Sequence, residues 1–170
     1  MGLFDKLTGT RHPGTGVAPR SAEEVRAALF ALNAPDVAYV VRNAAPAEKA
    51  DLLAEWRILE PAWNTFFLRT QLSRTLKIRM RLVPEKHEVR SLDEQWDVTW
   101  AGNTPRLAIS AEQSRGQVKT VSKRWSVERG EDGELHKTEI FHFDTAQLKD
   151  PLRDAVLAAG WTWRGAVFKL

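Results

Sequence analysis

The sequence predicts an α+β fold: a curved antiparallel sheet of about six to eight strands with two or three helices packed on one face. The chain has 170 residues, 43% of them hydrophobic and seven of them Trp, which suffices for one continuous core. Alternating apolar residues fill most of its second half, and a capped helix is expected near each end. A single domain is expected to span residues 21–170, after a flexible segment of residues 1–20.

The N-terminal segment has two parts. Residues 10–20 are rich in Gly, Pro and Thr and have no periodic apolar positions, which is typical of a linker. Before them, Leu3, Phe4 and Leu7 suit a short interfacial membrane anchor. The alternative is a terminus that is frayed or docked on the domain.

The first predicted helix begins at Ser21. Ser21 and Glu24 form a capping box, in which a hydroxyl and a carboxylate bind otherwise unpaired backbone N–H groups. Apolar residues follow at helical spacing until Asn33 and Pro35 end the helix. Residues 37–42 are short and β-branched, and they are therefore predicted to be a strand.

Residues 47–59 are ambiguous between helix and strand. Their composition favours a helix, whereas apolar residues at every second position from Leu52 to Ile58 favour a strand. We expect a strand over residues 51–59. Pro61 suits the first position of a following helix. The aromatic side chains of that helix, expected in the core, are Trp63, Phe66 and Phe67.

The following part of the chain is predicted to form strands almost throughout. Asp132 followed by Gly133 is a strong hairpin signal, because Gly accepts a positive φ without steric cost. Consecutive hairpins imply an antiparallel sheet. The expected strands are residues 76–82, 94–100, 106–112, 117–129 and 134–143.

The C-terminal part is predicted to contain one more helix and one more strand. Asp150 is expected to cap the helix, with Pro151 as its first residue and Gly160 at its left-handed end. Residues 161–170 then form a closing strand, in which Gly165 suits a β-bulge.

Two stretches, RMRLVPEKHEVRSLDEQWDVTW (79–100) and KDPLRDAVLAAGWTWRGAVFKL (149–170), resemble a family of uncharacterised bacterial proteins with no assigned function. The resemblance extends over residues 37–170. It implies neither an activity nor any site residues.

The composition excludes several kinds of chemistry. The chain has no cysteine, which excludes disulfides and thiolate sites and fits a cytoplasmic location. It also lacks the long apolar run that a signal peptide or a transmembrane segment requires, so neither is predicted. Ser110, Ser114 and Ser122 lack the G-x-S-x-G pattern of a nucleophile. His136 and His142 are about 20 Å apart on one strand, too far to bind one ion. We therefore expect no metal and no cofactor, and the sequence favours a non-enzymatic function without deciding it.

The best functional lead is a run of alternating cations. Residues 69–90 contain seven basic and two acidic residues, a local net charge of +5, whereas the whole chain has +3. Lys77, Arg79 and Arg81 occupy every second position of one expected strand and share one face. With Arg74 they are the candidate anion-binding residues. The alternative is an ordinary solvated sheet face.

The register of the predicted hairpin decides what lies beside these cations. One register would bury Asp93 and Gln95 among the apolar residues of the first strand, at about 1–3 kcal/mol for each unpaired group, so we expect it to be disfavoured. The other places Asp93 and Asp97 beside the cations, where Asp93 pairs with Lys77 or Arg79. Its expected apolar face contains Leu92, Trp96, Val98 and Trp100.

Two functions remain open. The first is a non-enzymatic binding or adaptor domain that docks a protein or an anionic surface, of phosphate or acidic lipid headgroups, through residues 69–90. Nucleic acid is disfavoured as a partner, because the aromatic residues are expected on the opposite face. The second is a module that binds a small apolar or aromatic ligand between sheet and helices. The expected lining of that cavity is Trp63, Trp96, Trp100, Trp161 and Trp163.

Overall fold

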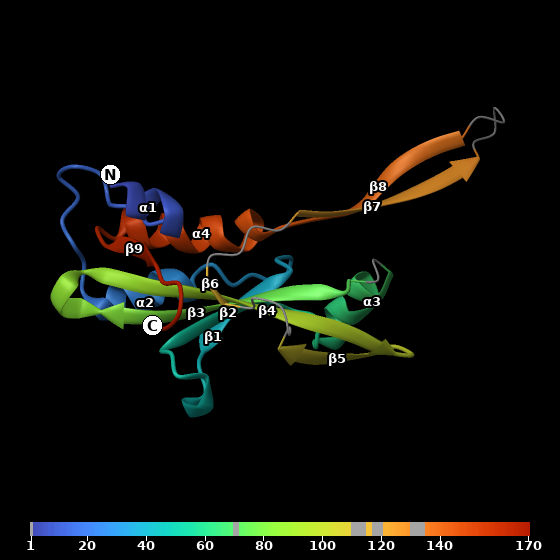
Figure 1. Ribbon diagram of the computed structural model, residues 1–170, viewed down its shortest axis with the longest axis horizontal. Coiled ribbons are helices and arrows are strands. Elements are labelled where there is room, and N and C mark those ends of the chain that lie inside the picture. The colour runs from blue at the N-terminus through green and yellow to red at the C-terminus, as the bar shows by residue number, and fades with distance from the viewer. Residues whose placement is uncertain (1, 70–71, 110–114, 117–120, 130–134) are drawn as a thin grey trace.

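The computed structural model describes residues 2–69, 72–109, 115–116, 121–129 and 135–170. It confirms the α+β class, with an antiparallel sheet and two helices packed against it (Figure 1). Within the described residues, no helix is both long enough and apolar enough to cross a bilayer.

The main sheet has a continuous antiparallel path and two short additions. Its strands are β1 (Tyr39–Asn43), β2 (Leu52–Trp56), β3 (Arg74–Val83), β4 (Glu88–Ala101), β5 (Thr104–Ile109), β6 (Arg115–Gly116) and β9 (Thr162–Gly165). Strands β1 to β5 lie side by side in chain order, each antiparallel to its neighbour, as consecutive hairpins predict. The short strand β6 pairs antiparallel with β4, whereas β9 pairs parallel with the beginning of β4.

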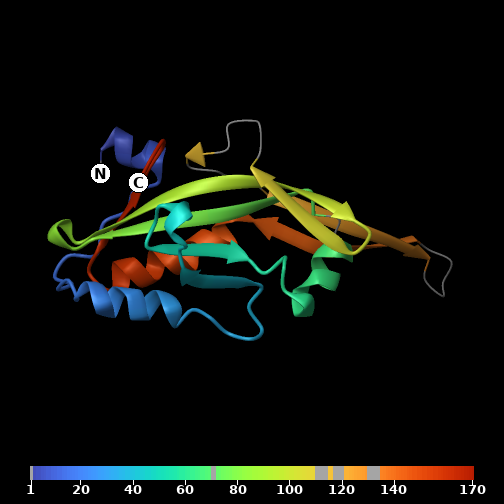
Figure 2. The same cartoon turned by 90° about the horizontal axis from the view of Figure 1, so that it is seen from below.

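Two helices cover one face of this sheet. They are α2 (Ala22–Phe30) and α4 (Thr145–Ala158). Helix α2 has the predicted capping box: the Glu24 N–H donates to Ser21 Oγ at 3.2 Å, and the Ser21 N–H donates to the Glu24 carboxylate at 2.8 Å. In Figure 2 both helices lie below β3 and β4. The core between helices and sheet includes Val25, Leu29, Leu52, Ile78, Met80, Val89, Leu148, Leu152 and Val156.

The start of α4 differs from the prediction. The helix begins at Thr145, so Pro151 lies inside it, and Asp150 is not its cap but pairs with Arg153 at 2.9 Å. A proline inside a helix costs about 3 kcal/mol, because it removes a backbone hydrogen bond. Burial of large apolar side chains, at about 1.5–3 kcal/mol each, offsets that cost. The buried side chains on either side of the proline are Leu148, Leu152 and Val156. Gly160, with φ of 75°, follows the helix as predicted.

The ambiguous segment forms a strand. Strand β2 confirms this expectation, although it ends at Trp56. Before it lies the short 3-10 helix η1 (Pro46–Glu48), which is followed by Lys49 with a positive φ of 51°. Helix α3 (Pro61–Arg69) begins at the proline, as predicted. Phe67 is buried, whereas Phe66 is exposed, so only part of the aromatic face enters the core.

The N-terminal residues lie along the end of the chain. The helix there is α1 (Leu3–Thr8). Arg11 exchanges two backbone hydrogen bonds with Trp163 of β9, at 2.8 and 2.9 Å. The Trp161 indole N–H donates to the Arg20 carbonyl at 2.7 Å. Residues 10–20 thus make the contacts of a docked segment. Their predicted mobility can be tested by removing residues 1–20 and measuring the melting temperature.

The hairpin that precedes α4 is separate from the main sheet. It consists of β7 (Val121–Arg129) and β8 (Leu135–Asp144). These strands form a two-stranded sheet of their own, which projects from the body in Figure 1. The predicted pairing is confirmed, but it does not extend the main sheet. Its predicted turn at Asp132 and Gly133 lies outside the described residues.

Candidate anion-binding site

The hairpin of β3 and β4 has the register that we expected to be disfavoured. Ile78 lies opposite Asp93, and Leu76 lies opposite Gln95. Since residues directly opposite each other share a face of the sheet, Asp93 lies on the apolar side. The predicted placement of Asp93 and Asp97 beside the cations is therefore wrong.

A buried ion pair removes the penalty on which that expectation was based. Asp93 is fully buried, and the Lys149 ammonium of α4 donates a hydrogen bond to its Oδ2. A lone buried carboxylate would cost several kcal/mol, whereas a hydrogen-bonded partner offsets much of that desolvation. Helix α4 packs on this face of the sheet and so brings the partner to Asp93.

The observed register brings a different set of side chains beside the cations. The opposite pairs are Lys77 with Glu94, Arg79 with Leu92, and Arg81 with Arg90. Leu92 and Trp96, both predicted on the apolar face, therefore share the face of the cations. Val98 is buried in the core cluster, although alternation along β4 places it on the same face as Trp96.

The cations line an open groove of about 620 Å³. Residues of β2, β3 and β4 form its floor, and η1 and residues 168–170 contribute its walls. Figure 2 shows the C-terminal end on the side of the sheet away from α2 and α4. The basic residues of the groove are Lys49, Lys77, Arg79, Arg81 and Lys169. Its acidic residues are Glu48 and Glu94, and its large exposed or partly exposed apolar residues are Trp96, Ile109, Phe168 and Leu170.

Lys77 is held between a carboxylate and an aromatic ring. Its Nζ lies 3.4 Å from Glu55 Oε2 and 4.2 Å from the centre of the Trp96 ring. The Trp96 indole N–H donates to Glu94 at 2.8 Å, which fixes the ring on the groove floor. A cation on an aromatic face adds about 0.5–2 kcal/mol of attraction, so Lys77 is well ordered for binding.

The two arginines are positioned mainly by backbone oxygens. Both guanidinium groups donate to the Lys49 carbonyl, Arg79 at 3.2 Å and Arg81 at 3.0 Å. Arg81 also donates to a main-chain oxygen of Leu170 at 3.3 Å, and Arg79 lies 3.8 Å from a Glu94 oxygen. The buried Nε of Arg79 has no hydrogen-bond partner among the described residues. The guanidinium groups are thus preorganised, with donor capacity left over.

The groove has an excess of positive charge. Five basic and two acidic side chains line it, a net charge of +3. Two hydrogen bonds from Arg42 lower the pKa of Glu48 to about 2, so this carboxylate is ionised and already paired. In the described part of the chain, no Asp or Glu side chain forms an ion pair with Lys49, Arg81 or Lys169. Glu55 and Glu94 partly neutralise Lys77 and Arg79, whereas Arg81 is held by the main-chain oxygens of Lys49 and Leu170.

Arg74, the fourth predicted anion-binding residue, lies apart from the groove. It pairs with Asp97 at 3.8 Å, and both side chains are about half exposed. By alternation along β3 it also faces the other side of the sheet from Lys77. The structure therefore brings together three of the four predicted cations.

The five predicted cavity tryptophans lie in different places. Trp161 and Trp163 are buried in the core. Trp63 on α3 packs against Phe66, and Trp100 donates its indole N–H to the Leu72 carbonyl at 2.9 Å. Trp96 lines the groove on the opposite face. The apolar space between sheet and helices is filled by the core cluster, and the structure brings no set of these five into one pocket among the described residues.

Several groove residues were not found from the sequence. Lys49, Ile109, Phe168 and Lys169 are distant along the chain from β3, and no local pattern connects them to it. Only the fold places η1 and the C-terminal residues beside the cations. A detectable signal was the excess of basic residues at 69–90.

No cluster of three potential metal ligands exists among the residues that the structure describes. The side chains of His136 and His142 fall outside that description. Comparisons with protein-family models, with curated proteins and with solved structures found no match. The interpretation of the groove therefore rests on its geometry and charge.

Proposed function

We propose that the protein is a non-enzymatic binding module that holds the phosphate or carboxylate groups of an anionic partner surface in the basic groove. The observation that supports this most directly is the set of three cations, Lys49, Arg81 and Lys169, that line the groove without an Asp or Glu side chain as partner among the described residues. Charge-assisted hydrogen bonds to such groups are about twice as strong as neutral ones.

The arrangement of the groove cations favours an anion-binding site over an ordinary solvated sheet face. The side chains of Lys77 and Arg79 are only 13% exposed, so they are partly desolvated before any ligand arrives. Their positions are also fixed by Trp96 and by the Lys49 carbonyl. A preorganised, partly dry cationic site loses less entropy and less hydration on binding an anion than free surface lysines do.

The lining favours recognition rather than catalysis. Its polar side chains are cations and two carboxylates that already have basic partners, Glu48 with Arg42 and Glu94 with Arg79. Nucleophilic or general-base catalysis needs a poised Ser, Cys, His or carboxylate within reach of a substrate. The groove offers positive charge and an aromatic edge, which are the requirements of anion binding.

The test compares two triple variants that lose the same charge. The groove variant is Lys49→Gln with Arg81→Gln and Lys169→Gln. The control changes three cations that do not line the groove: Arg20→Gln, Lys86→Gln and Arg106→Gln. Isothermal titration calorimetry, at low and at physiological salt, measures the affinity of each protein for inositol hexakisphosphate.

We expect the groove variant to bind inositol hexakisphosphate at least about tenfold more weakly than the wild type. The affinity of the control should change less than about twofold, because contacts and not total charge decide the affinity. Wild-type binding should also weaken with salt. Glu94→Gln, which removes a groove acid, should strengthen it. Equal losses in both triple variants, or no wild-type binding at low salt, would overturn the proposal in favour of a self-neutralised sheet face.

A further inference from the structure

The short helix α1 presents three large apolar side chains to solvent. Leu3, Phe4 and Leu7 are 77%, 68% and 71% exposed. Their spacing of i, i+1 and i+4 places them on one side of the helix. Phe168, in the wall of the groove, is 84% exposed. Single exposed apolar residues are normal on a protein surface, but a group of this kind indicates an interaction site.

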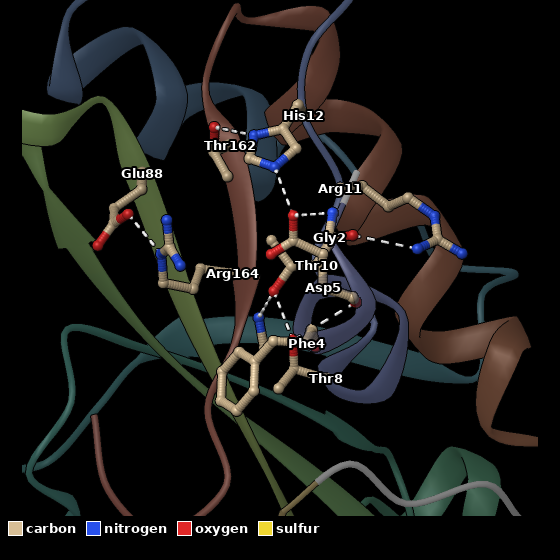
Figure 3. Close-up of polar contacts among 11 residues, drawn as sticks. Gly2, Phe4, Asp5, Thr8, Thr10, Arg11, His12, Glu88, Thr162 and Arg164 are labelled. Carbon is tan, nitrogen blue, oxygen red and sulfur yellow. Dashed lines mark hydrogen bonds and ion pairs between the residues drawn. The ribbon is translucent and has the colours of Figure 1, made fainter.

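Polar contacts hold α1 in place. The hydroxyls of Thr8 and Thr10, both buried, lie 2.8 Å apart, and the Gly165 N–H of β9 donates to Thr10 Oγ1 at 3.1 Å. The His12 ring lies 3.2 Å from the Asp5 carboxylate (Figure 3). The helix is therefore attached through its polar side, and its apolar side chains remain available for a partner.

Helix α1 and the groove wall formed by the C-terminal residues lie on the same side of the sheet. In Figure 2, α1 and the C-terminal end both lie above β3 and β4, whereas α2 and α4 lie below them. The C-terminal residues 168–170 also form a wall of the groove. One flat partner can thus meet α1, Phe168 and the mouth of the groove at once.

The charges on this side complement an anionic partner. Lys6 of α1 and Lys169 beside Phe168 are exposed. The buried Glu88 carboxylate is held by Arg164 at 2.7 Å and by Arg90 at 2.8 Å. Asp5 is paired with His12, which lowers the pKa of Asp5. The acids near α1 and β9 are therefore matched by basic groups.

We propose that this side of the protein docks on the surface of an anionic lipid bilayer. Leu3, Phe4, Leu7 and Phe168 enter the boundary between headgroups and acyl chains, and the groove takes lipid phosphates. This inference rests on the proposed function and names the source of the anion. Stable interfacial attachment generally requires two signals, and apolar insertion together with a cationic patch supplies them.

A bilayer fits these features better than an acidic peptide does. A peptide lying in the groove would contact Trp96 and Phe168 but not α1, whose residues do not line the groove. A membrane surface offers phosphates and an apolar layer over a wide plane, and so it contacts both regions simultaneously. The exposed apolar residues then have a partner whose chemistry matches theirs.

The first test measures co-sedimentation of the protein with lipid vesicles. The vesicles contain either phosphatidylcholine alone or phosphatidylcholine mixed with roughly a quarter phosphatidylglycerol. Leu3→Ser with Phe4→Ser and Leu7→Ser should reduce the partition coefficient on the anionic vesicles by about tenfold or more. Affinity for inositol hexakisphosphate should not change, because the groove is intact. The matched control, Val17→Ser with Leu59→Ser, removes exposed apolar side chains elsewhere and should leave vesicle binding unchanged.

The second test places a probe in the proposed contact. The chain has no cysteine, so Leu7→Cys gives a unique site for an environment-sensitive fluorophore. Anionic vesicles should shift its emission to the blue and protect it from an aqueous quencher. The same label at Leu59→Cys, on an exposed position outside α1 and the groove, should show neither change.

The outcomes separate this inference from the proposed function. Binding of inositol hexakisphosphate without binding to anionic vesicles, or vesicle binding that the α1 variant does not change, overturns the membrane inference and leaves the groove function standing. Loss of both ligands in the groove variant, with loss of vesicles alone in the α1 variant, supports both. Absence of both kinds of binding in the wild type overturns both.

Discussion

The buried pair of Asp93 and Lys149 makes a quantitative prediction. The Asp93 side chain is fully buried and that of Lys149 is 16% exposed, so the pair lies in a medium of low polarity. Lys149→Met preserves the apolar stem but removes the ammonium, leaving the carboxylate without this partner. Removing one member of a buried pair costs about 3–5 kcal/mol, and we expect a loss of that size in the free energy of unfolding.

Urea denaturation, followed by circular dichroism, measures this loss. Two variants control it. Lys86→Met removes an exposed cation and should change stability by less than about 0.5 kcal/mol. Asp93→Leu combined with Lys149→Met removes both charges and should return the protein to within about 1.5 kcal/mol of the wild type. If Lys149→Met costs no more than Lys86→Met, the pair does not stabilise the register and the reasoning is refuted.

Three further predictions concern the ends of the chain, α4 and the wall of the groove. Removal of residues 1–20 should lower the melting temperature by roughly 10 °C, because it breaks the backbone pairing with Trp163 and leaves the buried Trp161 indole N–H without its acceptor. A change of a few degrees in thermal melting would restore the interpretation as a linker. Asp150→Ala should cost less than about 0.5 kcal/mol in urea denaturation, since Asp150 lies inside α4 in a partly exposed pair, and a loss above 1 kcal/mol would indicate a helix that begins there after all. Glu48→Gln should destabilise the protein by about 1 kcal/mol at pH 7, because the folded-state pKa of Glu48, about 2, lies below its usual value of 4.5. This stabilisation is present above pH 4.5 and is lost as the pH falls toward 2, so the difference between the variant and the wild type should shrink over that range, and a difference independent of pH would contradict the assignment.

Local signals in the sequence predicted local structure well. The capping box of Ser21 and Glu24 and the left-handed Gly160 each involve residues within one turn of each other, and both are confirmed. The antiparallel hairpins followed from alternation and short turns. At Pro151, in contrast, the local preference for a first helical position was overridden by burial of neighbouring apolar side chains in the core.

The candidate site depended on distant residues, and here prediction from the sequence was incomplete. Alternation along β3 placed Lys77, Arg79 and Arg81 on one face. What lies beside them depends on the register, and the residue that permits the observed register, Lys149, is 56 positions from Asp93. The groove walls come from η1 and the C-terminal residues, which reach the cations only through the tertiary fold.

The position of β9 has a consequence for how the molecule folds. This strand, close to the C-terminal end, lies between β4 from the middle of the chain and Arg11 from its N-terminal part. Loop closure over such a separation is entropically costly and follows the formation of nearby hairpins such as β3 with β4. The groove wall at residues 168–170 comes directly after β9 in the chain. During synthesis the cationic strand is therefore made and paired early, whereas a complete binding surface exists only after residues 168–170 have also left the ribosome.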